Sequence, residues 1–382
     1  MCIRDRFPPT ASIAAVGGNF RFLGGGAFWS NRIVYHWNKA VVEGLDILDP
    51  TTRILDMSRI GPVLTFEDEA VRKGPPVTAM LIQNTNPAVV APDTNRVLKG
   101  LKRDDLFLCV HEQFLTETAQ LADIVLPATM FLEHDDIYQA GGHMHLQIHR
   151  EVIEAPDQTR SNHWVINELA KCLGAQHPGF GMTEWELIDK TLLDSGWPSA
   201  DVLLEKKWHD VQPSFADSHF LNGFPTSTGR FQFSADWSQL GPLGSKLPKY
   251  PDHCDNIDSA TAEKPFRLVT SPARNYLNTS FTETPTSKRK EVRPTVKIHP
   301  DAAEQLCLED GDKVRLGNEQ GSVVLNASIF SGLQTNVVVV ESVWPNSAFE
   351  EGVGINTLIS AEAGPPNGGA VFHDTAIWIK PA

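Results

Sequence analysis

Three short, mostly apolar runs, separated by segments that can form helices, constrain the fold of this chain most strongly. The runs are Ala79–Ile82, Leu106–Val110 and Asp123–Leu126, and the helical segments are 95–101 and 115–122. Such runs, without alternation, are typical of a parallel sheet covered by helices on both faces. Ligands of these sheets bind at the carboxyl ends of the strands. Those ends are Asn84–Pro87, His111-Glu112 and the residues from Pro127 onward.

Composition excludes several classes of protein. The chain has 382 residues, enough for two domains. It contains 33 Lys and Arg residues and 47 Asp and Glu residues, so the net charge is −14. A chain this acidic is a poor nucleic-acid binder. It has no stretch of about 18 apolar residues, so we expect no membrane span. No G-x-G-x-x-G follows any of the three runs, which argues against an ordinary NAD site.

The cysteines indicate neither a disulfide framework nor a metal cluster. Cys2, Cys109, Cys172, Cys254 and Cys307 are far apart, and no C-x-x-C pair is present that could hold zinc or an iron–sulfur cluster. Cys109 lies inside the second apolar run, which predicts a buried free thiol.

A histidine-rich stretch follows the third run. In a strand, His143 and His145 would share one face, and two imidazoles can ligate a metal. With Asp135-Asp136 this suggests a metal-dependent hydrolase, although polar contacts to a ligand or solvent explain the histidines more simply. Residues 163–173 form an amphipathic pattern, with Asn162 as a plausible N-cap and Gly174 at the end.

The remainder divides into a connecting region and a β-rich domain. Residues 176–263 carry many prolines and tryptophans, and we interpret them as an irregular connection in which Gly229–Phe233 alternates like a strand. Residues 264–382 contain short strands with regular turns, which predict a small closed barrel. Residues 11–175 form the α/β domain, and residues 1–10 have the character of a non-native extension.

These parts, in this order, resemble the molybdopterin oxidoreductases, the dimethyl sulfoxide reductase-like family. The resemblance covers Ala11–Leu173 and Pro265–Lys380. Singly the motifs are weak, and their joint order carries the match. They are Gly17–Asn19 with Gly24–Gly26, Asn84–Pro87, Thr116–Ala119, Ala122–Pro127, Glu133, Gly141-Gly142, Gln147, Arg160–Trp164, Asn278–Ser280, Pro300–Ala303, Asp310–Asp312, Gly321, Gly354–Asn356 with Leu358, and Phe372-His373.

The resemblance implies a Rossmann-like parallel sheet domain followed by a double-psi β-barrel domain. It also implies a cofactor in which molybdenum or tungsten is held by two molybdopterin guanine dinucleotides (bis-MGD). Asn86 and the pair His111-Glu112 match positions that hold the guanosine part of one dinucleotide, and His134 and Asn162 match further contacts. Many relatives carry Asp where Glu112 and Asn162 stand.

Further contacts are implied in the barrel domain. One loop there crosses the pterin and pyrophosphate, and the final glycine-rich segment adds contacts that would order it. Simpler interpretations stay open: Asn86 as a turn residue, Asn162 as a helix cap, His134 and His373 as surface histidines, and Arg274 in an ion pair. The matching residues are Thr270, Ser271, Arg274, Asn278, Thr279, Ser280, Phe349, Asn356 and His373.

We therefore expect the C-terminal part of an oxidoreductase catalytic subunit, for oxygen-atom or two-electron transfer. The metal ligand and any [4Fe–4S] cluster would lie in an N-terminal part, so this chain alone would be inactive and has no catalytic residue that we can name. Its partners would be that N-terminal part and an electron-transfer subunit. The alternative is a non-catalytic module that binds a pterin nucleotide. We expect a cytoplasmic location, or a periplasmic one if an export signal preceded the chain.

One geometric expectation follows from the strand-end rule and the resemblance together. Asn86 and Glu112 each end a parallel strand, so they should share one edge of the sheet. Asn356 would reach the same cleft from the barrel, with His111 and Arg274 nearby.

Overall fold

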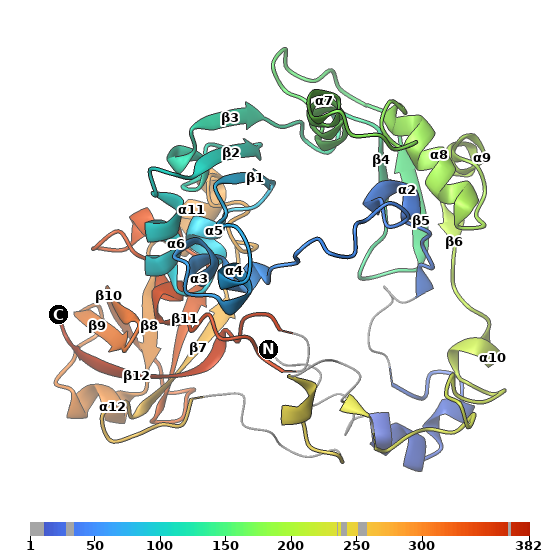
Figure 1. The fold of residues 1–382 in the computed structure, drawn as a ribbon. Helices are drawn as coiled ribbons and strands as arrows, with labels where there is room; N and C mark the ends of the chain where they lie inside the picture. The colour runs from blue at the N-terminus through green and yellow to red at the C-terminus, as the bar shows by residue number, and fades with distance from the viewer. Residues whose placement is uncertain (1–10, 28–33, 235, 238–242, 251–257, 366–367) are drawn as a thin grey trace.

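The computed structural model describes residues 11–27, 34–234, 236–237, 243–250, 258–365 and 368–382. The expectation for residues 1–10, together with Cys2 and Cys254, lies outside these ranges. Figure 1 shows three groups of elements: a small sheet, a barrel beside it, and a separate group around α7, α8 and α9. No helix in the described ranges is both long and apolar enough to cross a membrane.

The predicted parallel sheet is confirmed. Strands β1 (Ala79–Gln83), β2 (Phe107–Glu112) and β3 (Ile124–Pro127) pair in the order β1-β2-β3, with Cys109 opposite both Leu81 and Ile124. Helix α6 (Thr94–Leu101) lies where it was expected. The helix predicted over 115–122 is wrong, because only the single turn η4 (Ala119–Leu121) forms there. The hydroxyl of Thr118 accepts from the N–H of Ala88 and so ties this segment to the β1 side of the sheet.

Helices cover one face of this sheet. Ile82, Leu108 and Val110 share a core with Leu64 of α3 (Ile60–Leu64), with α6 and with Ala119 of η4. The expectation that helices cover both faces is not met within the described residues, because Phe107 is 51% and Ile124 44% exposed on the other face. Both connections run in the same direction across the sheet, and right-handed connections of that kind fall on one face.

The second group is more regular than the sequence indicates. A capping box formed by Thr183 and Glu186 starts α8 (Glu184–Asp194), and α9 (Ala200–Lys206) follows. Residues 184–194 and 200–206 are therefore helical rather than irregular. Their buried side chains Leu192 and Leu203 pack with Leu146 of the antiparallel sheet β4-β5-β6. The bounds of that sheet are β4 Asp136–Tyr138, β5 His145–His149 and β6 His209–Asp210.

Two further local expectations are corrected here. Ser161, not Asn162, caps α7 (Asn162–Leu173), because its hydroxyl accepts from the N–H of Trp164; Gly174 ends the helix at φ 68°, as predicted. Gly229–Phe233 forms no strand. Its aromatic rings instead join a cluster that reaches back to the N-terminal segment, made of Phe20, Phe220, Phe224, Phe231 and Phe233.

The predicted barrel is confirmed as a closed six-stranded barrel. Its strand order is β10-β8-β11-β7-β12-β9, and inward residues such as Val296, Leu316 and Ile377 are completely buried. Two strand pairs are parallel, β7 with β11 and β8 with β10. The bounds are β7 Phe266–Pro272, β8 Thr295–Ile298, β9 Lys313–Asn318, β10 Gly321–Ile329, β11 Val337–Ser342, β12 His373–Pro381, α11 Pro285–Glu291 and α12 Pro300–Gln305.

The segment after β11 connects the barrel to the sheet group by hydrogen bonds to the short helix α5 (Pro87–Val90). The side-chain amide of Asn346 donates to Ala88 O at 2.8 Å, and that of Asn356 donates to Val89 O and Val90 O at 3.1 and 3.0 Å. These two residues belong to the turns η7 (Asn346–Ala348) and η8 (Ile355–Leu358). Contacts with α5 thus order this stretch.

The short elements that remain connect these groups. They are η1 Asn19–Arg21, α2 Ala40–Glu43, η3 Met57–Arg59, α4 Glu69–Arg72, α10 Phe215–Ser218 and η6 Gly244–Lys246, and residues 11–16 are also helical.

Candidate functional site

A cavity lies at the carboxyl ends of the three parallel strands. Asn84, Gln113 and Thr129, which follow β1, β2 and β3, all line it. The arrowheads of these strands in Figure 1 point toward α7, and residues 161–163 at the start of that helix form another wall. The cavity has a volume of about 410 Å³, within the usual range for small-molecule sites. The strand-end rule therefore predicts the place of this cavity correctly.

The polar groups of the cavity come from four different segments. The exposed amides of Asn84 and Asn162 approach each other, Nδ2 to Oδ1, at 3.4 Å. Nδ1 of His134 is 2.9 Å from the hydroxyl of Thr129, so when that hydroxyl donates, the Nε2–H of His134 faces Asp136 at 3.8 Å. Amide, imidazole and carboxylate groups thus meet in one cavity and offer both hydrogen-bond donors and acceptors.

An aromatic surface completes the cavity. Phe131 lines it and is 56% exposed, although Phe is usually buried. Its backbone is fixed by the hydroxyl of Tyr138, which lies 3.2 Å from Phe131 O and 2.7 Å from His149 Nε2. Burial, followed by the charge of Asp136, raises the pKa of Tyr138 well above its ordinary value, so this phenol stays protonated.

These groups fit the guanosine end of a dinucleotide. Guanine presents acceptors at N7 and O6 and a donor at N2. The amides of Asn84, Asn162 and Gln113 can donate to the first two, and Asp136 can accept from the third. The exposed ring of Phe131 offers a stacking surface for the base.

The predicted strand-end residues have different surroundings from the expected ones. Asn86 is 7% exposed, and its Oδ1 accepts from the N–H and the hydroxyl of Thr118 at 3.2 and 2.7 Å. His111 is completely buried, with Nδ1 3.1 Å from Gln83 Nε2 and Nε2 3.0 Å from Arg160 O. Glu112 is half-buried and accepts from the N–H of Gln113. None of the three lines the cavity.

The structure thus separates the predicted residues into two sets. His134 and Asn162 line the cavity, whereas His111 holds the Arg160 segment that leads into α7. Sequence reasoning missed Asn84, Gln113 and Phe131. The signal for Asn84 was its place directly after β1, where its φ is 49°, in the left-handed region that Asn tolerates.

The predicted barrel residues lie away from this cavity. Thr270 donates to Phe372 O, and Phe349 is part of the barrel core. Asn356 is bound to α5, the short helix that Asn86 also contacts, so these two residues lie together there and not in this cavity. The convergence of Asn86, Glu112 and Asn356 on one cofactor cleft stays a prediction. His373 starts β12, opposite Val269. The remaining residues belong to β7 or the following loop, where Arg274, Asn278 and Ser280 are exposed and Ser271 and Thr279 are half-buried.

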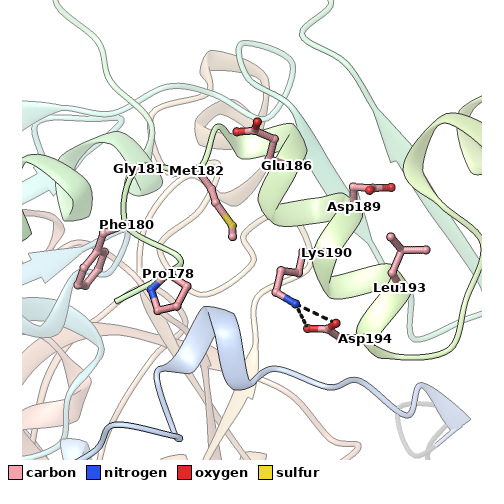
Figure 2. Close-up of a pocket in the computed structure, with 9 residues that line it drawn as sticks. All are labelled: Pro178, Phe180, Gly181, Met182, Glu186, Asp189, Lys190, Leu193 and Asp194. Carbon is pink, nitrogen blue, oxygen red and sulfur yellow. Dashed lines mark hydrogen bonds and ion pairs between the residues drawn. The ribbon is translucent and has the colours of Figure 1, made fainter. Parts of the chain in front are cut away.

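Figure 2 shows another pocket, beside α8, with a volume of about 600 Å³. Its charged groups already have partners within the chain. Lys190 pairs with Asp194 at 2.8 Å, Asp189 accepts from the N–H of Ala200, and Glu186 belongs to the capping box of α8. Because no polar group there points to a ligand, the cavity at the strand ends is the better candidate.

The histidine-rich stretch does not assemble the ligand set that a hydrolase would need. His143 Nδ1 accepts from the N–H of His145, and Asp135 accepts from Arg150 and from the N–H of Glu151. Across the residues that the structure describes, no three His, Cys, Asp or Glu side chains are grouped so that they could hold a metal ion. The described cysteines Cys109, Cys172 and Cys307 are free, and Cys109 is half-buried rather than buried.

A parallel sheet with a polar cavity at its carboxyl edge, joined by hydrogen bonds to a closed barrel, defines an α/β protein with a β-barrel domain and a ligand cavity at the strand ends. Family models agree: residues 55–172 match the molybdopterin oxidoreductase model, and residues 266–376 match the molydopterin dinucleotide-binding domain. The chain belongs to the molybdopterin oxidoreductase family.

Relatives support this assignment. "Probable oxidoreductase YoaE" of Bacillus subtilis is 32% identical over 97% of this chain and 53% of its own length. The dimethyl sulfoxide/trimethylamine N-oxide reductase of Rhodobacter capsulatus is 25% identical over 82% of this chain and 42% of its own. The acetylene hydratase from Pelobacter acetylenicus shares the fold, with a TM-score of 0.67 and 18% identity over 85% of this chain and 46% of that one. This chain spans about half the length of YoaE.

Proposed function

We propose that this chain binds the guanosine end of a molybdopterin guanine dinucleotide in the cavity at the carboxyl ends of β1–β3. It would do so as part of a molybdenum or tungsten oxidoreductase. The observation that carries the proposal is that residues following all three parallel strands line one cavity with His134 and Asn162. When bound, the metal centre of this cofactor supplies oxygen-atom or two-electron transfer.

The residues of this chain would bind and orient the nucleotide. Asn84 and Asn162 hydrogen-bond the base or ribose, and Phe131 stacks on the base. His134 donates from Nε2, because the Thr129 hydroxyl occupies its Nδ1. His111 does not contact the nucleotide itself. It is a positioning residue that fixes the backbone at Arg160, two residues before Asn162.

The barrel residues complete the proposal on the pterin side. The loop after β7 carries Arg274 and Asn278–Ser280, and a guanidinium such as that of Arg274 suits a pyrophosphate. We also infer that the barrel has the double-psi connectivity; its two parallel strand pairs, β7 with β11 and β8 with β10, support this. The catalytic subunit as a whole would include an N-terminal part and work with an electron-transfer subunit.

Calorimetric titration of the purified chain with GDP tests the site. We expect binding that weakens about tenfold in Asn162→Ala and in His134→Ala, since one hydrogen bond contributes about 0.5–1.5 kcal/mol. Lys190→Ala is the matched control, because Lys190 lines the other pocket (Figure 2) and should leave the Kd unchanged. No GDP binding, or equal weakening in all three variants, would contradict the proposed site.

A further inference from the structure

The backbone of Phe131, whose ring forms the aromatic surface of the cavity, faces a hydroxyl donor that has a second acceptor. The carbonyl of Phe131 lies 3.2 Å from the hydroxyl of Tyr138, and the same hydroxyl lies 2.7 Å from Nε2 of His149. A phenol carries one hydrogen, so it cannot form a full hydrogen bond to both acceptors at once. Which of them receives the hydrogen depends on the state of His149.

The surroundings of His149 determine its tautomer. Its Nδ1 lies 2.7 Å from the carbonyl of Arg150, which can only accept, so Nδ1 carries a hydrogen. In the neutral imidazole Nε2 is then an acceptor, and the hydroxyl of Tyr138 donates to it. The two rings are also stacked, with centroids 5.2 Å apart and an interplanar angle of 20°. In this state the carbonyl of Phe131 does not receive the hydrogen of Tyr138.

Protonation of His149 reverses the hydrogen bond between the two rings. With a hydrogen on each nitrogen, Nε2 donates, and the oxygen of Tyr138 becomes the acceptor. The phenol hydrogen must then point elsewhere, and the carbonyl of Phe131 is within reach at 3.2 Å. Burial, followed by the charge of Asp136, raises the pKa of Tyr138, so this hydrogen is present in both states.

The charged groups that face His149 come from β4 and from the residue that follows β5. Asp136 lies opposite His149 in the register of the two strands. Arg150 is the next residue of the chain, and it pairs with Asp135 at 2.9 Å. The other face of β5 is apolar and packs on α8 and α9. Asp136 also has the imidazole of His134 at 3.8 Å, so a test must separate the two histidines.

We propose that His149 is a positioning residue for the nucleotide cavity, which acts through the hydroxyl of Tyr138 on the backbone of Phe131. When His149 is charged, the phenol holds the carbonyl of Phe131, and the ring stays in place for stacking on a base. When His149 is neutral, this restraint is lost. An imidazole ordinarily changes charge between about pH 5 and 8, so a nucleoside should bind more tightly at the acidic end of that range. The effect on binding rests on the proposed function, whereas the exchange of hydrogen bonds does not.

The exchange can be measured in the chain without ligand. We would label the carbonyl carbon of Phe with ¹³C and the amide nitrogen of Leu with ¹⁵N, so that an HNCO spectrum selects the five Phe–Leu pairs of the sequence, Phe131–Leu132 among them. We expect the carbonyl signal of Phe131 to shift as pH falls from about 8 to about 5.5, because the carbonyl gains a donor. In Tyr138→Phe the signal should stay fixed, since this variant keeps the ring and lacks the hydroxyl.

Binding of guanosine measures the consequence for the cavity. Guanosine is the probe because it has no phosphate group that changes charge in this range. His149→Phe keeps an aromatic ring beside Tyr138 but offers no acceptor, so the phenol can donate to Phe131 at every pH. We expect this variant to bind guanosine about fivefold more tightly than the unsubstituted chain at about pH 8, and equally at about pH 5.5. A purely structural role of His149 predicts weaker binding at both pH values. Any contribution of His134 is common to both proteins and cancels.

Three outcomes would overturn the proposal. The first is a carbonyl signal of Phe131 that does not move with pH, as expected if the phenol hydrogen turns to Asp136 instead. The second is an equal movement in Tyr138→Phe, which would be a direct effect of charge. The third is that His149→Phe binds guanosine no more tightly than the unsubstituted chain at about pH 8. If the carbonyl signal moves as expected and no protein binds guanosine, the proposed nucleotide site is wrong and the exchange of hydrogen bonds is supported.

Discussion

Two asparagines that lie two residues apart have opposite roles at the end of β1. Asn86 is buried, and its Oδ1 accepts both hydrogen bonds of Thr118, whereas Asn84 is exposed and faces the cavity. The Thr118 hydroxyl in turn accepts from the N–H of Ala88 at 3.0 Å. Asn86 therefore holds the loop that presents Asn84.

Substitutions of the two asparagines should separate these roles. We expect Asn86→Ala to lower the free energy of unfolding by about 1–3 kcal/mol, because two buried donors of Thr118 lose their acceptor. Asn84→Gly, which keeps the left-handed φ of 49° without strain, should change it by no more than about 0.5 kcal/mol, as is usual at exposed positions, yet weaken GDP binding. Urea denaturation measures the first effect and titration the second. Equal stability of the two variants would contradict these assignments.

The sequence could predict the place of the site but not which asparagine faces it. The end of a strand can be estimated from hydrophobicity, so Asn84–Pro87 was correctly placed at the sheet edge. Which side chain turns inward depends on Thr118, which is 32 residues away from Asn86. The same limit applies to His111, whose burial depends on the Arg160 segment. A hydrogen bond between a side chain and a distant part of the backbone leaves no local pattern in the sequence.

At the scale of elements, the capped turn η3 links the sheet group to the C-terminal segment. Asp56 accepts from the N–H and the hydroxyl of Ser58 and, at 3.1 Å, from the N–H of Gly369. Burial alone would raise the pKa of Asp56. The hydrogen bonds from Ser58 and Gly369, with the charge of Arg59, outweigh burial and hold it below its ordinary value of 3.8.

This lowered pKa predicts a pH dependence of stability. A carboxylate with a depressed folded-state pKa stabilises the fold at pH values above its unfolded pKa, and the contribution is lost as pH falls through the folded value. Asp56→Ala should therefore lower Tm at pH 6, and the difference from the unsubstituted chain should shrink as pH falls below about 4. Asp49→Ala is the comparison: Asp49 also has a lowered pKa, but its side chain bonds only to Thr51, two residues away, so we expect a smaller loss of Tm at pH 6 than for Asp56→Ala. A difference in Tm that is constant with pH would contradict this role.

At the scale of the whole molecule, strands with a repeated local pattern could be predicted from the sequence. Hydrogen bonds between segments that are far apart in the sequence could not. The parallel strands and the barrel strands each carry enough apolar side chains to identify them. The helices in 184–206 were missed because prolines and tryptophans nearby hide their period, although the Thr183–Glu186 capping box was present in the sequence. The sequence analysis expects contacts with a cofactor to order the glycine-rich segment after β11. In the structure, hydrogen bonds from Asn346 and Asn356 hold this segment on α5.

Limited proteolysis tests this organisation. We expect chymotrypsin to cut first at Leu221 or Phe233, which are 47% and 45% exposed and lie outside helices and strands. Cleavage within α8 and α9 should be slower, because Leu192 and Leu203 are completely buried. Mass spectrometry of the first fragments gives the order of cuts. Early cleavage inside β9–β11, with residues 219–234 intact, would contradict this organisation of the chain.

The hydrogen bonds that hold α5 also have a consequence for the order of folding during synthesis. The carbonyls of Val89 and Val90 receive their hydrogen bonds from Asn356, 266 or more residues later in the chain. A one-turn helix is too short to persist alone in water, and contacts of such high sequence separation form late. Residues up to Asn356 must therefore leave the ribosome before α5 acquires these hydrogen bonds. In the proposed function, nucleotide would bind only after this part of the chain has been synthesised.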